Sequence, residues 1–381
     1  MSAPTQNTDI AAGRRLVIKI GSALLVDEDS GAIRSDWLSA LATDIAACRA
    51  RGQQVLIVSS GAVAVGRRHL KFGNGTLRLE EKQAAAATGM VRLAHAYQEM
   101  LAQFDLTVAQ VLLTLHDTEE RRHYLNARNT MATLLRAGAV PLINENDTVA
   151  TDEIRFGDND RLGARVAAMV TADTLVLLSD IDGLYTADPS KNPSARWIPE
   201  VHEITPELEA MAGAALPGHG TGGMVTKLAA AKVALGAGCR MVISNGHALH
   251  PLKRIEEGER CTWFLPAANP MTARKRYISG TLKPAGTLVI DPGAAKALDA
   301  GKSLLPPGVV DVKGRFNKGA AVMVKTVDGR EVARGLCAYS ADDARLIQGH
   351  KCSEIEARLG YRGPDEMIHA DNLALDRRKS G

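Results

Sequence analysis

Near its amino terminus the chain reads Leu16-Val17-Ile18-Lys19-Ile20-Gly21, an aliphatic and β-branched run that stops at a glycine. Such a run is typical of a buried strand. Similar runs recur at Val55–Val58, Val108–Leu113, Ala139–Ile143, Leu175–Leu178 and Met241–Ile243. Apolar residues at helical spacing lie between them, at Leu38–Arg51, Glu80–Gln103, Asp117–Ala137, Arg161–Thr171 and Met224–Leu235. Strands that alternate with helices predict an α/β domain, with a mainly parallel open sheet sandwiched by helices.

The pattern changes after about residue 266, where prolines punctuate a series of short strand-like runs. These runs are Thr287–Ile290, Val309–Val312, Ala321–Thr326 and Glu331–Tyr339. Asp328-Gly329 is a hairpin signal between the last two. This part therefore predicts a small, mostly-β, barrel-like domain, with helices near Ala294–Ala300 and Ala341–Leu346. The divisions we expect are a disordered tail at 1–13, the α/β domain at 14–266, a linker at 267–280, the β-rich domain at 281–362 and a C-terminal tail at 363–381.

The composition is that of a soluble globular protein, since 45% of the 381 residues are hydrophobic and 23% are charged. It excludes a chain disordered throughout, and no apolar run approaches the ~18–20 residues of a membrane span. The net charge is +3 overall, with 27 basic and 30 acidic residues up to residue 270 and 19 and 13 after it. The basic C-terminal part could meet nucleic acid, although a solvated surface is the more common reason for such a charge.

Five scattered cysteines form no Cys-x-x-Cys pair, so neither a zinc site nor a disulfide framework fits. The first dozen residues are polar and lack the apolar region of a signal peptide. Together these features predict a protein of the reducing cytoplasm.

Polar and glycine-rich residues follow several predicted strands, at the edge where ligands bind in open parallel sheets. They are Gly21-Ser22, Ser59-Ser60-Gly61, Asn144–Asp147 and Ser179-Asp180. Ordinary turns favour the same residues, but so many at one edge indicate a site. Lys19 lies within the first strand, where it would point either to solvent at a sheet edge or into that site. We favour the site, because the rest of the run is apolar.

The most distinctive stretch is Gly218-His219-Gly220-Thr221-Gly222-Gly223-Met224-Val225-Thr226-Lys227. It matches Gly-x-Gly-x-x-Gly, but it follows a helix-like segment, and no acidic residue lies about 20 positions on. These departures exclude a dinucleotide fingerprint, and the spacing of a Walker A loop is absent too. A glycine-rich loop that enters a helix carrying Lys227 predicts an anion site of backbone amides, helix dipole and one lysine. A surface loop without such a role is the alternative.

Asp158-Asn159-Asp160 precedes a predicted helix. Its carboxylates could cap that helix, or they could orient lysines or magnesium beside a phosphate. The residues alone leave both possibilities open. His116, His123 and the other histidines show no metal-ligand spacing, and no Ser-His-Asp arrangement is present.

Taken in order, these motifs resemble the glutamate 5-kinases, a family of the amino-acid kinase superfamily. The resemblance covers nearly the whole chain, and its most specific parts are Asn144–Asp147, Gly157–Asp160 and Gly220–Lys227. The β-rich end is similar to the PUA domain that many of these kinases carry. One departure is Ser179, where a threonine is often found, and it retains the hydroxyl.

The resemblance implies that ATP, with Mg²⁺, phosphorylates the side-chain carboxylate of L-glutamate in the first step of proline biosynthesis, with proline as a feedback inhibitor. It implies catalytic roles for Lys19, Lys227, Asp158 and Asp160, and glutamate contacts from Ser60, Asp147 and Asn159. The implied ATP contacts are Lys19, Gly21, Ser179, Asp180, Thr221, Gly222, Gly223, Met224, Val225, Thr226 and Lys227. Mg²⁺ would be bound mainly through the ATP phosphates, with no certain protein ligand.

We also expect a homo-oligomer without membrane contact. Two alternatives stay open. The first is another amino-acid kinase, acting on acetylglutamate, aspartate or a nucleotide. The second is a protein that binds RNA through its PUA domain.

Overall fold

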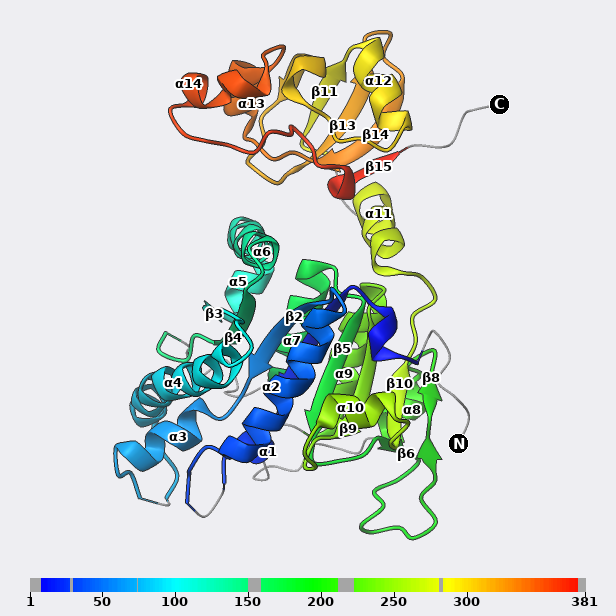
Figure 1. The fold of residues 1–381 in the computed structure, drawn as a ribbon. Helices are drawn as coiled ribbons and strands as arrows, with labels where there is room; N and C mark the ends of the chain where they lie inside the picture. Colours follow the sequence, from blue (N-terminus) through cyan, green and yellow to red (C-terminus); the bar gives the residue numbers. More distant parts are fainter. Residues whose placement is uncertain are drawn as a thin grey trace. The chain divides into compact units, whose positions relative to one another are not determined.

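The structure, a computed structural model, describes residues 8–27, 30–73, 75–149, 159–211, 223–280 and 284–375. The chain forms two compact units, Met1–Pro270 and Met271–Gly381, and each is described by itself (Figure 1). Within the described ranges, no helix combines the length and the apolar character that crossing a bilayer requires.

The first unit is built on an eight-stranded sheet of order β3-β4-β2-β1-β5-β9-β10-β8. Its strands are β1 (Arg15–Ile20), β2 (Gln54–Ser59), β3 (Val108–Leu113), β4 (Val140–Glu145), β5 (Thr174–Ser179), β8 (Glu200–Val201), β9 (Arg240–Asn245) and β10 (Cys261–Phe264). All neighbours are parallel except β9 and β10. A hairpin of β6 (Leu184–Tyr185) and β7 (Trp197–Ile198) stands outside this sheet. The prediction of a mainly parallel sheet is confirmed.

Helices cover both faces of this sheet (Figure 1). They are η1 (Ile10–Ala12), α1 (Ser22–Leu25), α2 (Ser35–Ala50), α3 (Ala62–His69), α4 (Leu79–Ala102), α5 (Leu115–Glu119), α6 (Arg121–Arg136), α7 (Asn159–Val170), α8 (Pro206–Met211), α9 (Met224–Gly236) and α10 (Pro251–Glu256). Because side chains of a strand alternate between faces, Leu16 and Ile18 of β1 pack in a core with α2 and α4. Val17 packs in the opposite core, with α7 and α9. Lys19 therefore shares the face on which α7 lies.

The segment predicted as one helix at Asp117–Ala137 forms two helices, α5 and α6. The chain is extended at Glu120, with φ −71° and ψ 123°. Side chains cap the start of each helix, because Asp117 accepts a hydrogen bond from the Thr114 amide before α5 and Glu120 accepts one from the His123 amide at the start of α6. Caps of this kind satisfy amides that have no partner within the helix. The spacing of apolar residues does not predict such caps, so it predicts one continuous helix.

The backbones of α3 and α4 pack in direct contact. A Cβ on Gly66 would lie 1.7 Å from the carbonyl oxygen of Ala85, and a Cβ on Gly89 would lie 1.8 Å from that of Ala62. Only glycine permits so close an approach. Since α3 follows the end of β2 after two residues, this contact holds α4 beside the loop that leaves β2.

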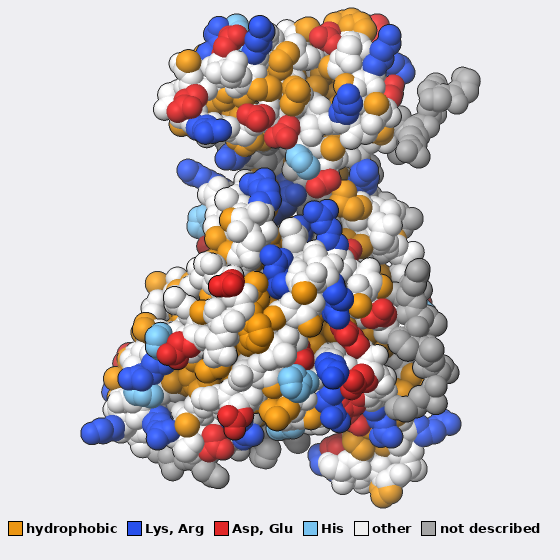
Figure 2. All heavy atoms as spheres, viewed as in Figure 1, with side chains coloured by type: hydrophobic (Ala, Val, Ile, Leu, Met, Phe, Trp, Pro, Cys, Tyr) orange, Lys and Arg blue, Asp and Glu red, His pale blue; other side chains and the backbone are white. Residues whose placement is uncertain are grey.

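A buried carboxylate joins α2 to α10. Asp44 is 5% exposed and accepts hydrogen bonds from the His250 ring and from the Leu252 amide, both at 3.0 Å. It thus caps the first turn of α10 from another helix. Figure 2 shows basic and acidic side chains side by side over this part of the surface, where Arg51 pairs with Glu256 at 2.6 Å.

The second unit contains a five-stranded sheet of order β12-β11-β13-β14-β15. Its strands are β11 (Gly286–Ile290), β12 (Val309–Gly314), β13 (Ala321–Thr326), β14 (Glu331–Leu336) and β15 (Leu373–Leu375). Its helices are α11 (Pro270–Gly280), α12 (Pro292–Asp299), η2 (Pro306–Gly308), α13 (Ala341–Ile347), η3 (Cys352–Glu354), α14 (Ile355–Leu359) and η4 (Ala370–Asn372). β11 and β13 are parallel and the other neighbours antiparallel. The prediction of a separate sheet at this end is confirmed.

Residues 363–375, predicted as part of a C-terminal tail, instead complete the second unit. β15 pairs with β14, and Met367 and Ile368 are wholly buried. Residues 376–381 lie outside the described residues. In residues 363–375 apolar and polar side chains are mixed without a run long enough to predict a strand, and the place of this segment in the sheet comes from pairing with a strand far away in sequence.

The predicted linker and the predicted N-terminal tail also contain folded parts. The linker at 267–280 is mostly α11, whose Ile278 is buried in a cluster of the second unit. In the tail at 1–13, Ile10 is wholly buried, and its carbonyl accepts a hydrogen bond from the Gln53 side chain at 2.9 Å. The first seven residues lie outside the described ranges.

Candidate active site

The carboxyl ends of β4, β2, β1 and β5 lie next to one another in the sheet, so the loops that follow them meet at one edge. Two backbone hydrogen bonds tie these loops to neighbouring strands. The Gly21 amide donates to the Leu178 carbonyl and the Ser60 amide donates to the Ile20 carbonyl, each at 3.2 Å. Because the Gly21 amide is used in this way, the anion contact expected at Gly21 would fall to the amides that follow it.

Lys19, Asp160 and Lys227 form one buried cluster at this edge. Nζ of Lys19 lies 2.6 Å from Oδ1 of Asp160, and Nζ of Lys227 lies 3.3 Å from Oδ2. The three residues are only 7%, 2% and 2% exposed. Oγ1 of Thr226 lies 3.1 Å from the same Oδ2. Predicted residues from β1, α7 and α9 are thus brought together.

Two glycines help to place these side chains. The stem of Lys19 packs against Gly163 of α7, where an added Cβ would lie 3.4 Å from the Cβ of the lysine. Gly223 is the residue before α9, and its carbonyl accepts the Thr226 hydroxyl at 2.7 Å. The first turn of α9 therefore presents Thr226 and Lys227 to Asp160.

The Asp160 carboxylate is held in its charged form. Burial alone raises its pKa, but the charges of Lys19 and Lys227 outweigh burial and hold the pKa below its ordinary value. Two ammonium groups and one carboxylate leave an excess of one positive charge among these three side chains. In a poorly solvated site such a charge attracts anions more strongly than it would in water. The cluster is suited to hold a phosphoryl group.

A second polar cluster surrounds Asn159, the first residue of α7. Its side-chain amide donates to Ser60 Oγ and to the Ser59 carbonyl, both at 2.9 Å. Oδ1 of Asn144 lies 3.5 Å from the same nitrogen and accepts the Glu145 amide at 2.8 Å. Oδ1 of Asn159 is buried without a hydrogen-bond partner among the described residues. Because a buried acceptor without a donor is costly, this oxygen is suited to meet a donor group of a ligand.

Asp147 lies two residues beyond β4 and is 6% exposed. Burial, and second the charge of Glu145, raise the pKa of Asp147 to about 7. A ligand ammonium group beside this carboxyl would favour its charged form. Asp147 is therefore suited to bind an amino group.

The other predicted ATP contacts lie at the ends of the expected elements. Ser179 is the last residue of β5, and its hydroxyl donates to Oδ1 of Asp180 at 2.8 Å. Met224 and Val225 occupy the first turn of α9. The predicted residues Asp158, Thr221 and Gly222 lie outside the described residues.

The donor set fits Mg²⁺ that arrives on the phosphates of ATP. Within the described residues, no group of three or more His, Cys, Asp or Glu side chains is arranged to hold a metal ion. Both oxygens of Asp160 are already occupied, by Lys19 on one side and by Lys227 and Thr226 on the other. In proteins Mg²⁺ is often bound through substrate phosphates and few carboxylates.

Ser59 and Asn144 belong to the site, although the sequence assigned them no role. Both contact the side chain of Asn159. The sequence held one indication of a role for them, namely their position at the ends of β2 and β4. Ser59 is adjacent to Ser60, and Asn144 lies in the same segment as Asp147.

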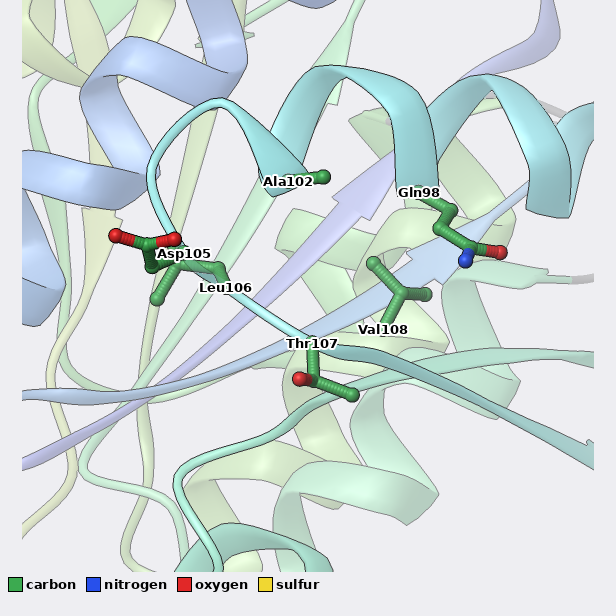
Figure 3. A pocket seen from close by; sticks show the side chains of 6 residues that line it. All are labelled: Gln98, Ala102, Asp105, Leu106, Thr107 and Val108. Carbon is green, nitrogen blue, oxygen red and sulfur yellow. The ribbon is translucent and has the colours of Figure 1, made fainter.

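A surface cavity of about 280 Å³ lies away from this site. It is lined by Gln98, Ala102, Asp105, Leu106, Thr107 and Val108. Figure 3 shows that these side chains come from the end of α4, from the turn that follows it and from the first residue of β3. That is the opposite edge of the sheet from the one that carries the polar clusters, so the cavity is not part of the candidate site.

Comparison with known proteins matches both units to described families. The amino acid kinase family matches residues 14–245, and the PUA domain matches residues 286–359. The chain is 64% identical to the glutamate 5-kinase of Paramagnetospirillum magneticum, over 96% of this chain and 99% of that protein. It is 62% identical to the glutamate 5-kinase of Rhodospirillum rubrum, over 95% and 96% of the two chains. Among solved structures it is similar to a UMP kinase from Bacillus anthracis, with a TM-score of 0.47 and 18% identity, over 67% of this chain and 97% of that one. On the family match and the two sequence relatives, the chain belongs to the amino acid kinase family and, within it, to the glutamate 5-kinases that carry a PUA domain.

Proposed function

We propose that this protein transfers the γ-phosphoryl group of ATP to the side-chain carboxylate of L-glutamate, forming L-glutamyl 5-phosphate in the first step of proline biosynthesis. The observation that carries this proposal is the cluster in which Lys19 and Lys227 share the carboxylate of Asp160. Family membership supports the choice of acceptor.

The reaction needs no general base, because a glutamate carboxylate with a pKa near 4.3 is already ionised at neutral pH. The obstacle is electrostatic, since an anion must approach a polyanion. Lys19 and Lys227 would neutralise the oxygens of the transferred group, and Asp160 would keep both ammonium groups in place. Mg²⁺ bound to the ATP phosphates supplies further positive charge.

The polar cluster next to the lysines would hold glutamate. Asp147 would pair with its α-ammonium group, while Ser60 and Asn159 would position the rest of the molecule. Oδ1 of Asn159 is buried without a hydrogen-bond partner among the described residues, and the ammonium group that pairs with Asp147 would also supply a donor to this oxygen. Asp158, Ser179, Asp180 and the loop before α9 keep their proposed roles toward the lysines and ATP.

We further infer that the enzyme works in the cytoplasm as a homo-oligomer that proline inhibits. Proline carries an ammonium and a carboxylate on the same carbon, as glutamate does. The resemblance supports these three inferences. RNA binding through the PUA domain is a separate possibility, supported by the excess of basic over acidic residues, 19 against 13, after residue 270.

The decisive experiment is an ATP-dependent assay of the full chain in which hydroxylamine traps the acyl phosphate. L-glutamate, acetylglutamate and aspartate are compared as acceptors. Hydroxamate formation with glutamate is expected, and product from acetylglutamate alone would overturn the proposal. For RNA, filter binding over a salt series is the matching test, because binding through phosphate contacts weakens steeply with salt.

A further inference from the structure

Tyr97 of α4 has its hydroxyl buried against the loop that leaves β2. It is 1% exposed and is among the largest fully buried side chains in the described part of the protein. Its hydroxyl lies 3.1 Å from Oγ of Ser59, and no other hydrogen bond of this hydroxyl is found among the described residues. Phenylalanine would fill the same apolar space, so packing alone does not account for the hydroxyl.

The hydrogen bonds from Tyr97 run in one direction. Oγ of Ser59 donates to the carbonyl of Ser60 at 3.2 Å, so its single proton is used there. Either hydroxyl could donate in the contact between Tyr97 and Ser59, and with the Ser59 proton on the Ser60 carbonyl the donor is Tyr97. Burial raises the pKa of Tyr97, which keeps the phenol protonated and able to donate. The result is a relay from α4 through Ser59 to the Ser60 peptide group.

The relay ends on the residue proposed to contact glutamate. Oγ of Ser60 accepts the side-chain amide of Asn159, and its own amide donates to Ile20. The next residue, Gly61, has φ 97°, and a Cβ there would lie 2.9 Å from Val26. The loop is therefore constrained at each residue, and the Ser60 carbonyl is constrained through Ser59.

The packing of α3 against α4 sets the position of Tyr97 relative to this loop. Gly66 and Gly89 bring α3 and α4 into backbone contact, and the loop connects directly to α3. A shift of α4 would require these two helices to separate. The phenol consequently offers its proton from a fixed point.

We propose that Tyr97 is a positioning residue for the glutamate subsite, which sets the orientation of Ser60 by donating to Ser59. This inference rests on the proposed function, because it assumes that Ser60 contacts glutamate. Tyr97 itself touches neither substrate. Its effect should fall on the binding of glutamate and spare the binding of ATP, whose expected contacts lie on other loops.

The test measures KM for both substrates in the full chain, for the parent protein and for Tyr97→Phe, Ser59→Ala and the double variant. Tyr97→Phe is expected to raise KM for glutamate about 3- to 10-fold, the range of one neutral hydrogen bond. KM for ATP should stay within about twofold of the parent value. If both side chains act through one relay, the double variant should equal Ser59→Ala and show no multiplied effect.

Tyr339→Phe is the matched control. Tyr339 is also 1% exposed, and its hydroxyl donates to the Pro364 carbonyl in the second unit. Removing this hydroxyl should leave KM for glutamate unchanged. Thermal unfolding of each variant shows whether a change in KM comes from a lost contact or from a loss of the fold. The double variant removes the hydroxyls of both Tyr97 and Ser59, so neither is left buried without its partner.

The outcomes separate the two proposals. If the parent protein forms no acyl phosphate from glutamate, the proposed function fails. If the parent is active and Tyr97→Phe has the parent KM for glutamate, only the role of Tyr97 is overturned. An equal rise of both KM values would also overturn it, because that result marks a general structural effect.

Discussion

Nζ of Lys19 lies 2.6 Å from Oδ1 of Asp160, and this contact joins the central strand of the sheet to the start of α7. The other oxygen of the same carboxylate holds Lys227, which α9 carries. One buried carboxylate thus sets the spacing of two ammonium groups. This geometry explains how a site without a general base could lower the barrier to phosphoryl transfer between anions.

Lys19→Ala and Lys227→Ala should each lower kcat by roughly 10²- to 10³-fold, because each removes one fixed charge from the path of the transferred group. Steady-state kinetics at saturating ATP and glutamate give the measurement. Lys232→Ala is the matched control, since this lysine also lies on α9 but is 48% exposed and pairs with Glu209. Near-normal turnover in either of the first two variants would remove that lysine from the mechanism.

Asp147→Asn should raise KM for glutamate much more than KM for ATP. The variant loses a charge-assisted bond to the α-ammonium group, a contribution of about 1.5–3 kcal/mol. Comparable increases in both KM values would instead identify Asp147 as a structural residue.

The pKa of Asp147, raised to about 7, also predicts a pH dependence. Below that pH the carboxyl is protonated in the free enzyme, so KM for glutamate should rise as the pH falls, by up to about tenfold per unit. Asp147→Asn should abolish this dependence. Between about pH 4 and 7, Asp147 holds a proton in the folded state that it has lost in the unfolded chain. The contribution of Asp147 to the free energy of unfolding therefore decreases as the pH rises through this range. A KM that is flat across pH 7 in the parent protein would contradict the assignment.

Gly66→Ala and Gly89→Ala should each destabilise the first unit by about 3 kcal/mol or more, because the added Cβ would overlap a backbone carbonyl of the facing helix. Urea unfolding measures the change. Gly236→Ala in α9 is the control, since a Cβ there meets nothing within 4 Å and should be neutral or stabilising by up to about 1 kcal/mol. Equal stabilities of all three variants would show that α3 and α4 are not in backbone contact.

Asp44→Ala should destabilise the protein by about 2–3 kcal/mol, because a buried amide at the start of α10 loses its acceptor. Asp36→Ala, on the exposed part of the same helix α2, should change stability by less than about 1 kcal/mol. Thermal unfolding of the two variants side by side checks the difference. A similar shift in both would mean that the cap contributes nothing beyond an ordinary surface charge.

A chain that ends at Pro270 should fold and retain kinase activity. The buried clusters of the first unit extend no further than Leu265, and those of the second begin at Ile278. All described residues with a proposed role in the chemistry lie at or before Lys227. Circular dichroism and the hydroxamate assay are the two measurements. A soluble, folded truncation without activity would show that the PUA domain helps to build the site.

The amino-acid sequence by itself determined the kind of fold and singled out candidate site residues at one edge of the sheet. Short apolar runs such as 16–20, separated by helical patterns, specify an α/β unit because both periodicities are local properties of the chain. Lys19, Ser60 and Asp147 could be named in advance because parallel strands bring their carboxyl ends, and the residues that follow them, to one edge. The β-rich end was recognisable for the same local reason.

Only the tertiary structure decided which of these residues meet. Lys227 and Asp160 are 67 residues apart, and their contact depends on how α9 and α7 pack on the sheet. The same holds for Tyr97, which nothing in the pattern of α4 distinguishes from a core residue, and for the glycine contact of α3 and α4. Ile10 and β15 were predicted to lie in tails. This prediction was wrong because their short segments are stabilised by partners far away in sequence, which a local pattern does not show. Local pattern determines which elements form, whereas the contacts between distant elements depend on packing that no single stretch of sequence contains.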